Sequence, residues 1–124
     1  MTDALRRCDA YLDAVATLAA DVVDVGPLRA FVSRAPYAYY VRPIPGRDLS
    51  VPGSVTGEHV RGAAAVLTDA GHPVSFEWVD ELAPMLGDVL RGEGYAVHRH
   101  PLLVRDLREP FDDPRRAVGL TARL

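Results

Sequence analysis

Apolar and polar positions follow one another along the chain with the periods of amphipathic helices and of strands. In residues 3–20, apolar residues recur every three to four positions with polar residues between them, which predicts a helix that buries one face. The expected buried face comprises Leu5, Cys8, Leu12, Val15 and Ala19, and the expected solvent face comprises Arg6, Asp9, Asp13 and Thr17.

The same period predicts two further helices in the second half of the chain. Residues 56–70 begin with Thr56, a good N-cap, and are followed by Gly71, a common helix stop. Residues 80–92 carry Pro84 in the first turn, where proline is tolerated. The expected buried residues of these two helices are Val60, Ala63, Ala64, Leu67, Leu82, Met85, Leu86, Val89 and Leu90.

Four segments have the composition or alternation of strands. Residues 28–33 and 37–44 are rich in β-formers and are joined by a tight connection. Residues 73–79 alternate, with Phe76 and Trp78 on one side and Glu77 on the other. Residues 95–105 form the last predicted strand, and Pro101 within it predicts a bulge or an edge position.

The resulting element order is α-β-β-α-β-α-β, which predicts an α+β domain with a mixed sheet and helices packed on it. We expect residues 1–106 to form this domain, and residues 107–124 to be a linker or tail that leads to a second domain. Residues 46–57 form the longest stretch without periodicity, which predicts a surface loop.

Composition excludes several classes of protein. The formal net charge is −3 and the arginines are scattered, whereas nucleic-acid binding needs a basic stripe. No apolar run reaches the roughly 20 residues of a membrane span, and no secretory leader is visible, so we expect a cytoplasmic protein without membrane contact. The single cysteine, Cys8, cannot form an internal disulfide and is expected to be a small buried hydrophobe.

An ordered set of motifs in the second half resembles a known family. Residues 76–79 read Phe-Glu-Trp-Val, Gly94-Tyr95 follows the last predicted helix, and residues 101–104 read Pro-Leu-Leu-Val. This set resembles the GNAT family of N-acetyltransferases, in which a Gly-aromatic pair begins the strand after the last helix. It is most similar to the N-terminal domains of actinobacterial members, where a second domain carries acetyl-CoA. The resemblance covers residues 3–106 and implies a bacterial protein with a GNAT-like fold.

The resemblance also identifies where the family binds its cofactor, and this chain departs from the pattern there. Family members cradle the pyrophosphate of acetyl-CoA with a glycine-rich turn at a helix N-terminus. The matching segment runs from Ser50 to Val60, where Gly53 and Gly57 have the wrong spacing and Glu58 adds a carboxylate. The family's tyrosine proton donor corresponds to Leu90, which has no proton to donate. We therefore expect no cofactor and no acetyl-CoA turnover.

A few other residues are candidates for chemistry or binding. Glu77 is a weak candidate for a general base if burial raises its pKa, and otherwise an exposed or arginine-paired residue. An aromatic strand and a tryptophan are candidates for a substrate or partner surface, or for packing against a helix: Tyr37, Tyr39, Tyr40, Arg42 and Trp78. His98 and His100 share a strand face, but too few other ligands are near for a metal site.

These expectations together favour a degenerate GNAT-like domain. Its function would be to pack on a catalytic GNAT domain, or to form a homodimer, and to help shape the acceptor site. Two alternatives remain open at this stage: a self-sufficient small acyltransferase that uses acetyl-CoA, and a non-enzymatic module that binds a small ligand or a partner. Residues 119–124 resemble the beginning of a further strand.

Overall fold

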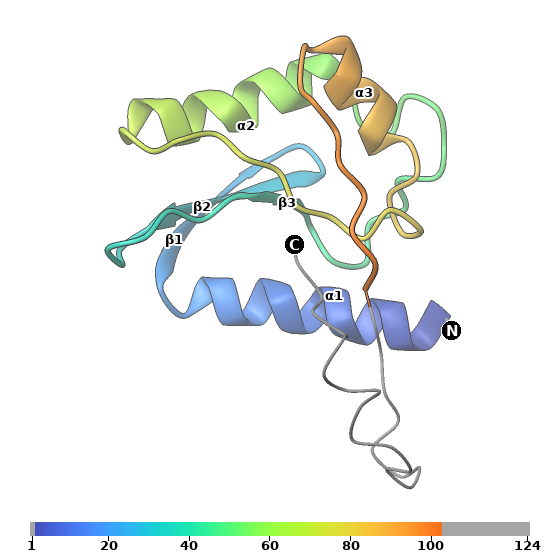
Figure 1. The fold of residues 1–124 in the computed structure, drawn as a ribbon, viewed down its shortest axis with the longest axis horizontal. Coiled ribbons are helices and arrows are strands. Elements are labelled where there is room, and N and C mark those ends of the chain that lie inside the picture. The colour runs from blue at the N-terminus through green and yellow to red at the C-terminus, as the bar shows by residue number, and fades with distance from the viewer. Residues whose placement is uncertain (1, 103–124) are drawn as a thin grey trace, which may run out of the picture.

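The structure, a computed structural model, describes residues 2–102 of the 124-residue chain. It is a small α+β fold with three helices and one three-stranded antiparallel sheet. The elements are α1 (Thr2–Thr17), β1 (Ala20–Val25), β2 (Leu28–Ser33), β3 (Val41–Pro43), α2 (Gly57–Asp69) and α3 (Leu86–Gly92). Figure 1 shows α1 on one face of the sheet and α2 with α3 on the other.

The sheet has the order β1-β2-β3, and β1 and β2 form a hairpin in which Val25 pairs with Leu28. The two-residue turn uses Gly26, whose φ of 56° is disfavoured for residues with a Cβ. A Cβ at this position would also come within 2.5 Å of the His59 ring. Gly26 therefore permits both the turn and the close approach of α2 to the hairpin.

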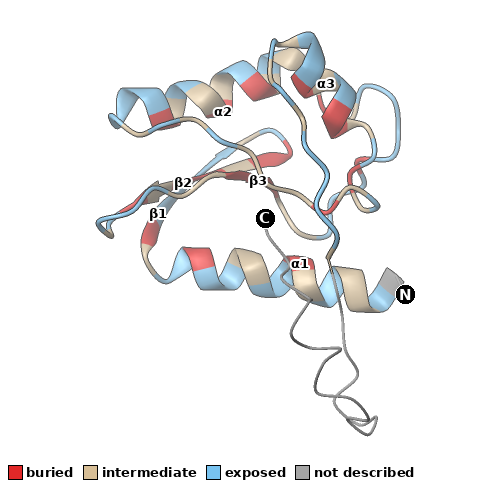
Figure 2. Ribbon diagram, viewed as in Figure 1, coloured by how far each residue is buried: buried red, intermediate tan, exposed pale blue. Residues whose placement is uncertain are grey.

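The hydrophobic core lies mainly between the sheet and the two helices above it. Its buried members come from β2, β3, α2, α3 and the loop before α2, and Figure 2 shows them on the facing sides of these elements. A smaller cluster of Ala16, Ala20 and Phe31 packs α1 onto the opposite face. The helix α1 thus contributes little apolar surface to the core, and most of its outward side is exposed.

The first half of the chain differs from the sequence prediction at two places. The helix predicted over residues 3–20 ends at Thr17, and Ala20 begins β1, a strand that the sequence did not predict. The next strand, Leu28–Ser33, has the predicted bounds. The strand predicted over residues 37–44 is reduced to Val41–Pro43, although the Phe31 N–H still donates to Tyr40 O at 3.1 Å.

The second half also has less regular structure than predicted. Residues 73–79 form only one isolated parallel bridge, between Val41 and Phe76, and the helix predicted over residues 80–92 is restricted to Leu86–Gly92. Pro84 precedes that helix and does not lie in its first turn. Of the strand predicted over residues 95–105, residues 95–102 are not in a strand, and residues 103–105 lie outside the described residues.

The orientation of α1 is the largest correction to the predicted faces. Asp9 is buried and Asp13 is half-buried, whereas Val15 is exposed. The reason is electrostatic, because the sheet presents arginines to this helix. Asp13 pairs with Arg29 at 3.0 Å, and Asp9 pairs with Arg42 at 2.6 Å. The carboxylates therefore point toward the sheet.

Candidate functional site

A fully buried arginine is the centre of the candidate site. Arg42 is on β3 and has 0% exposure, and its Nη2 donates to Asp9 Oδ1 at 2.6 Å. Its Nη1 donates to Glu77 Oε1 at 3.4 Å, and its buried Nε has no hydrogen-bond partner within residues 2–102. A buried guanidinium without carboxylates would cost several kcal/mol, so the two acids make this burial possible. We call Asp9, Arg42 and Glu77 the buried ion cluster.

Glu77 reaches the cluster because residues 75–77 run alongside β3. The Val41 N–H donates to Ser75 O at 2.9 Å, and the Glu77 N–H donates to Val41 O at 3.0 Å. Burial raises the pKa of Glu77 above its ordinary value, and the positive charge of Arg42 partly opposes this rise. Of the two readings of Glu77 from the sequence, the structure therefore shows an arginine-paired residue whose pKa is raised by burial.

Tyr40 connects the buried ion cluster to a group of aromatic rings. The Arg42 guanidinium carbon lies 6.0 Å from the centre of the Tyr40 ring, at the outer limit of a cation–π contact. Burial raises the pKa of Tyr40, and the charge of Glu77 adds to this effect while Arg42 opposes it. Tyr40 thus remains a neutral phenol that covers the side of the arginine.

The other predicted tyrosines belong to the same aromatic group. Tyr39 lies 5.8 Å from Tyr40 and 5.4 Å from Tyr37, with the rings edge to face. Phe31 of β2 packs beneath Tyr39 and Tyr40. Only Tyr37 extends well into solvent. Of the residues predicted to form a substrate or partner surface, Tyr37 is therefore exposed, and Tyr39 and Tyr40 are half-buried. Arg42 is fully buried, so it can influence such a surface only through the residues that contact it.

Trp78 lies in a separate cavity of about 330 Å³, which we call the edge groove. Its walls are residues 76–81, residues 97–102, Leu5 and Leu12 of α1, and residues of α3 with the proline before it: Pro84, Gly87, Asp88 and Arg91. The Trp78 indole N–H donates to Asp80 Oδ1 at 3.3 Å, and Asp80 pairs with Arg99 at 2.8 Å. Arg42 and Glu77 form part of the inner wall, so this groove and the buried ion cluster adjoin.

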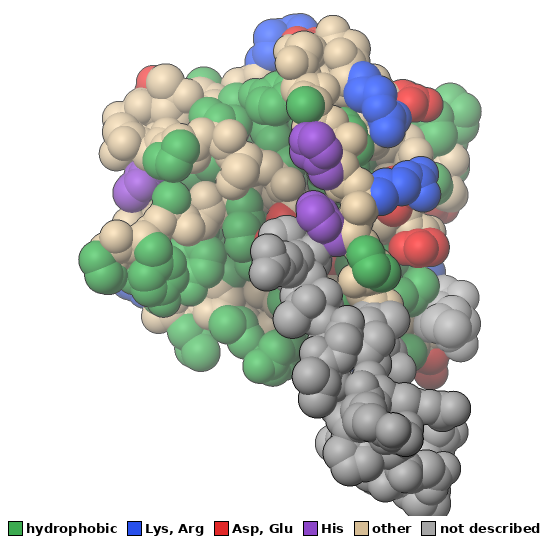
Figure 3. All heavy atoms as spheres, viewed as in Figure 1, with side chains coloured by type: hydrophobic (Ala, Val, Ile, Leu, Met, Phe, Trp, Pro, Cys, Tyr) green, Lys and Arg blue, Asp and Glu red, His purple; other side chains and the backbone are tan. Residues whose placement is uncertain are grey.

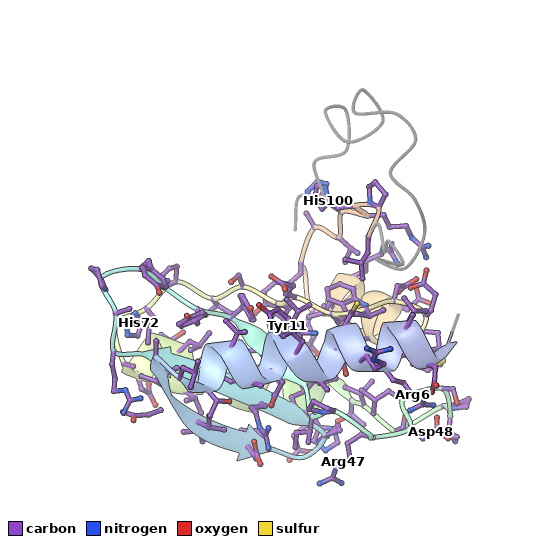
Figure 4. The ribbon with its side chains drawn as sticks, turned by 90° about the horizontal axis from the view of Figure 1, so that it is seen from below. Arg6, Tyr11, Arg47, Asp48, His72 and His100 are labelled. Carbon is purple, nitrogen blue, oxygen red and sulfur yellow. The ribbon has the colours of Figure 1, made fainter. Side chains whose placement is uncertain are left out.

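A second cavity, of about 450 Å³, opens at the carboxyl ends of β3 and of residues 75–79. We call it the strand-end cavity. Acidic and basic residues line it: Arg6, Asp9, Arg47, Asp48 and Glu81. Figure 4 shows Arg6, Arg47 and Asp48 at this end of the molecule. Its size and its charged lining make this cavity the second candidate site.

The N-terminus of α2 is occupied by the protein's own groups. Thr56 Oγ1 accepts from the His59 N–H, and His59 Nδ1 accepts from the Thr56 N–H, which completes a capping box. Glu58 lies in the first turn. The Glu93 carboxylate adjoins Gly57, where a Cβ would collide with it, and pairs with Arg61 at 2.6 Å. Two carboxylates thus adjoin the helix end that attracts anions.

The remaining candidates are not assembled into a site. Leu90 is 1% exposed and belongs to the hydrophobic core. His98 and His100 are exposed, and His59 serves in the cap of α2. Within residues 2–102 there is no group of three or more histidine, cysteine, aspartate or glutamate side chains placed to hold a metal ion. Cys8 is a half-buried free thiol.

Sequence reasoning missed Asp9 of the buried ion cluster, Glu93 beside α2 and the other charged residues of the strand-end cavity, Arg6, Arg47, Asp48 and Glu81. Asp9 recurs with Asp13 and Ala16 at helical spacing, and Arg42 lies between Val41 and Pro43 in a β-rich segment. A buried arginine requires a carboxylate, so these two patterns together could have paired them. Glu93 follows the last helix and contacts α2 only through the tertiary fold, so no local signal indicates it.

No known protein family, curated protein or solved structure matches this chain. The fold and the sites therefore define its class: a small α+β protein with a three-stranded antiparallel sheet and an ion cluster buried between sheet and helix. None of the helices among the described residues has the length and apolar character that crossing a membrane requires.

Proposed function

We propose that this chain is a GNAT-like domain that supports a catalytic GNAT domain without turning over acetyl-CoA itself. The arrangement of the chain after the hairpin supports the GNAT-like part. Three antiparallel strands are followed by α2, and residues 75–77 then return parallel to β3. This return, followed by α3, has the direction that a mixed sheet of the expected order requires.

The observation that carries the proposal is the state of the α2 N-terminus. In the family that the sequence resembles, this is the place where main-chain amides hold a pyrophosphate. Here the capping box satisfies the amides of Thr56 and His59, and the carboxylates of Glu58 and Glu93 adjoin the helix end. A diphosphate at this position would meet the negative charge of two carboxylates, and the His59 amide there already has a partner, so binding is opposed.

Leu90 supports the same conclusion independently. At the position where the resemblance places a proton donor, its side chain packs among the buried residues of the core. A substitution to tyrosine would have to displace that packing, so the position serves stability. We therefore propose that the domain lacks two of the requirements for acetyl transfer, anion binding and proton donation, at two separate places.

The exposed apolar residues support a role in packing on another domain. Except for Tyr37 and Val51, the large exposed apolar side chains of residues 2–102 lie on α1, on β1 or in the turn between them: Tyr11, Val15, Leu18, Val22 and Val23. Val22 and Val23 point to opposite faces of β1, and Val22 shares the face of α1, so we call Tyr11, Val15, Leu18 and Val22 the α1–β1 surface. Figure 3 shows hydrophobic side chains at the bottom of the molecule, over α1, and a second group on the left, over the connection between β2 and β3. Because β1 is an edge strand, a partner can cover this surface and pair with its backbone.

The strand-end cavity is the place where the domain would shape an acceptor site. Asp48 and Glu81 offer carboxylates to an amine, and Asp9 at the back of the cavity is held by Arg42. Hydrogen bonds from Ser50 lower the pKa of Asp48, so this carboxylate is ionised at neutral pH. An acetyl acceptor is an amine, and such a group is complementary to these acids.

Titration calorimetry with acetyl-CoA tests the proposal. We expect no binding by the unmodified chain at millimolar ligand, because the α2 N-terminus repels a diphosphate. The double variant Glu58→Gln, Glu93→Gln should bind acetyl-CoA more tightly than the unmodified chain, whereas Asp69→Asn at the other end of α2 should change nothing. Micromolar binding by the unmodified chain would instead support a self-sufficient acyltransferase.

A further inference from the structure

The outer edge of β1 carries backbone groups that point away from the rest of the sheet. The Phe31 N–H donates to Tyr40 O at 3.1 Å, so the backbone groups of Phe31 point toward β3. Val22 lies opposite Phe31 in the hairpin, and in an antiparallel ladder the backbone groups of such a pair point away from each other. The N–H and C=O of Val22, and by alternation those of Ala20 and Asp24, therefore point out of the sheet.

The surroundings of this edge are open within residues 2–102. The four middle residues of β1 are all exposed, whereas every residue of β2 beside it is buried or half-buried. In Figure 4, β1 runs along the lower border of the molecule, outside α1. At the opposite side of the sheet, β3 already bonds to residues 75 and 77 through Val41. Among the described residues, β1 is thus the edge that can accept a further strand.

We propose that β1 pairs antiparallel with β1 of a second copy of this chain, around a two-fold axis at Val22. In this register Val22 exchanges both backbone hydrogen bonds with Val22 of the second copy, and Ala20 exchanges both with Asp24 of the second copy. All the outward groups of these three residues are then used, and the three strands of each copy join into one continuous sheet. Because the pairing is isologous, it stops at two copies.

The acids of β1 select this register. Asp21 falls opposite Val23 of the second copy and Asp24 opposite Ala20, so no two carboxylates face each other across the axis. A shift by two residues in one direction would place Asp21 opposite Asp21 of the second copy. The same shift in the other direction would place Ala20 opposite Gly26, which lies in the turn beyond the strand, and would lose hydrogen bonds.

The charges and the apolar residues beside the axis favour a second copy as the occupant. The Asp21 residues of the two copies are diagonal neighbours roughly 7 to 8 Å apart. Arg34 pairs with Asp21 at 3.5 Å and its side chain is 57% exposed, so each copy brings a positive charge to this face. On the other face, Val22 of the α1–β1 surface meets Val22 of the second copy and loses contact with water.

Sedimentation equilibrium of the full chain tests the pairing. Val22→Pro removes the outward N–H at the axis, and proline is tolerated in an edge strand at a position whose N–H faces solvent. We expect it to raise the dissociation constant of the dimer at least about tenfold more than Val22→Ala, which keeps this N–H. Circular dichroism verifies that both variants fold. A monomeric unmodified chain, or equal effects of the two variants, overturns the inference.

Cysteine cross-linking tests the register and needs no proline. In a Cys8→Ala background, Asp21→Cys and Val23→Cys are made in separate chains, which are then mixed. The proposed register makes these two positions a directly opposed pair with Cα atoms about 4.5 Å apart, which a disulfide can bridge. We expect the mixture to form the linked dimer at least about fivefold faster than either variant alone.

Faster linkage of either variant alone would indicate one of the two shifted registers and would overturn the proposed one. Equal rates for the mixture and for the single variants would mean that the strands do not pair at this edge. The inference concerns the chain without another partner and does not rest on the proposed function. Its failure would therefore leave the outcome of calorimetry with acetyl-CoA unaffected.

Discussion

At the scale of single residues, Arg42 determines how α1 lies on the sheet. Its guanidinium is fully buried, and the carboxylates that neutralise it come from α1 and from residues 75–77. A helix with an ordinary apolar face would have buried Val15, but this helix instead turns Asp9 and Asp13 inward. The ion cluster therefore specifies the contact between helix and sheet at a position where little apolar surface is available.

Removing Asp9 should be strongly destabilising. In Asp9→Ala, Arg42 would keep its buried charge with only the 3.4 Å contact to Glu77, and we expect a loss of about 3 kcal/mol in the free energy of unfolding. Asp88→Ala breaks an exposed ion pair of α3 and should cost less than about 0.5 kcal/mol. Urea denaturation of both variants measures the difference, and similar values for the two would contradict a buried cluster.

Glu77 should make stability fall as pH rises above the ordinary pKa of a glutamate. The folded state raises the pKa of Glu77, so between the unfolded and folded values the folded protein holds more protons. Stability is therefore highest below the unfolded pKa and decreases through this window. Asp24 and Asp48, whose pKa values are lowered, act at lower pH and with the opposite sign.

The variant Glu77→Gln isolates this effect, because glutamine does not ionise. We expect the difference in unfolding free energy between Glu77→Gln and the unmodified protein to shift in favour of the variant as pH rises from about 4 to about 7. Denaturation at a series of pH values in this range measures it. A constant difference across the series would show that burial does not perturb Glu77.

At the scale of elements, the sequence predicted those whose signals are local and missed those that depend on distant contacts. The capping residue Thr56 and the stop at Gly71 placed α2 to within a residue at each end, and β2 has its predicted bounds. The strand β1 has Asp21 and Asp24 among three valines, and it is held by the hairpin with β2 and by ion pairs to Arg34 and Arg29. Nothing in its own composition indicates those partners.

The candidate site was predicted in the same uneven manner. The aromatic strand signal selected Tyr40 and Arg42, and alternation selected Glu77, and the structure brings these three together. Trp78 lies in the edge groove, which Glu77 also lines. Asp9 was assigned to solvent, because a helical period defines opposite faces without identifying which face meets the protein.

The capping box of α2 should contribute measurably to stability. Thr56→Ala removes the hydroxyl that accepts from the His59 N–H, and we expect a loss of about 1 kcal/mol. Thr68→Ala, at an exposed position of the same helix, should be neutral or slightly stabilising because alanine has the higher helix propensity. Thermal or urea unfolding compares the two. Equal effects would mean that the first turn of α2 is held by other contacts.

At the scale of the whole molecule, apolar residues are distributed unequally between the two faces of the sheet. The side of α2 and α3 carries the main core, while the side of α1 has a small cluster and an exposed apolar surface beside an edge strand. A protein that functions alone usually keeps such surfaces small, because they promote association. This asymmetry is the physical basis for the proposed packing on another domain.

The same surface should drive self-association when no other partner is present. Leu18 is 81% exposed and directly follows α1, on which Val15 and Tyr11 are also exposed, so we expect the unmodified chain to form dimers at high concentration. Leu18→Glu should shift this equilibrium toward the monomer by at least about tenfold in the dissociation constant, because a charge would be buried in the contact. Val51→Glu places the same charge on an exposed valine of the loop before α2 and should leave the equilibrium unchanged.

Light scattering or sedimentation equilibrium across a concentration series measures all three proteins. If the unmodified chain stays monomeric at high concentration, the α1–β1 surface does not suffice for association and this support for the proposed packing is lost.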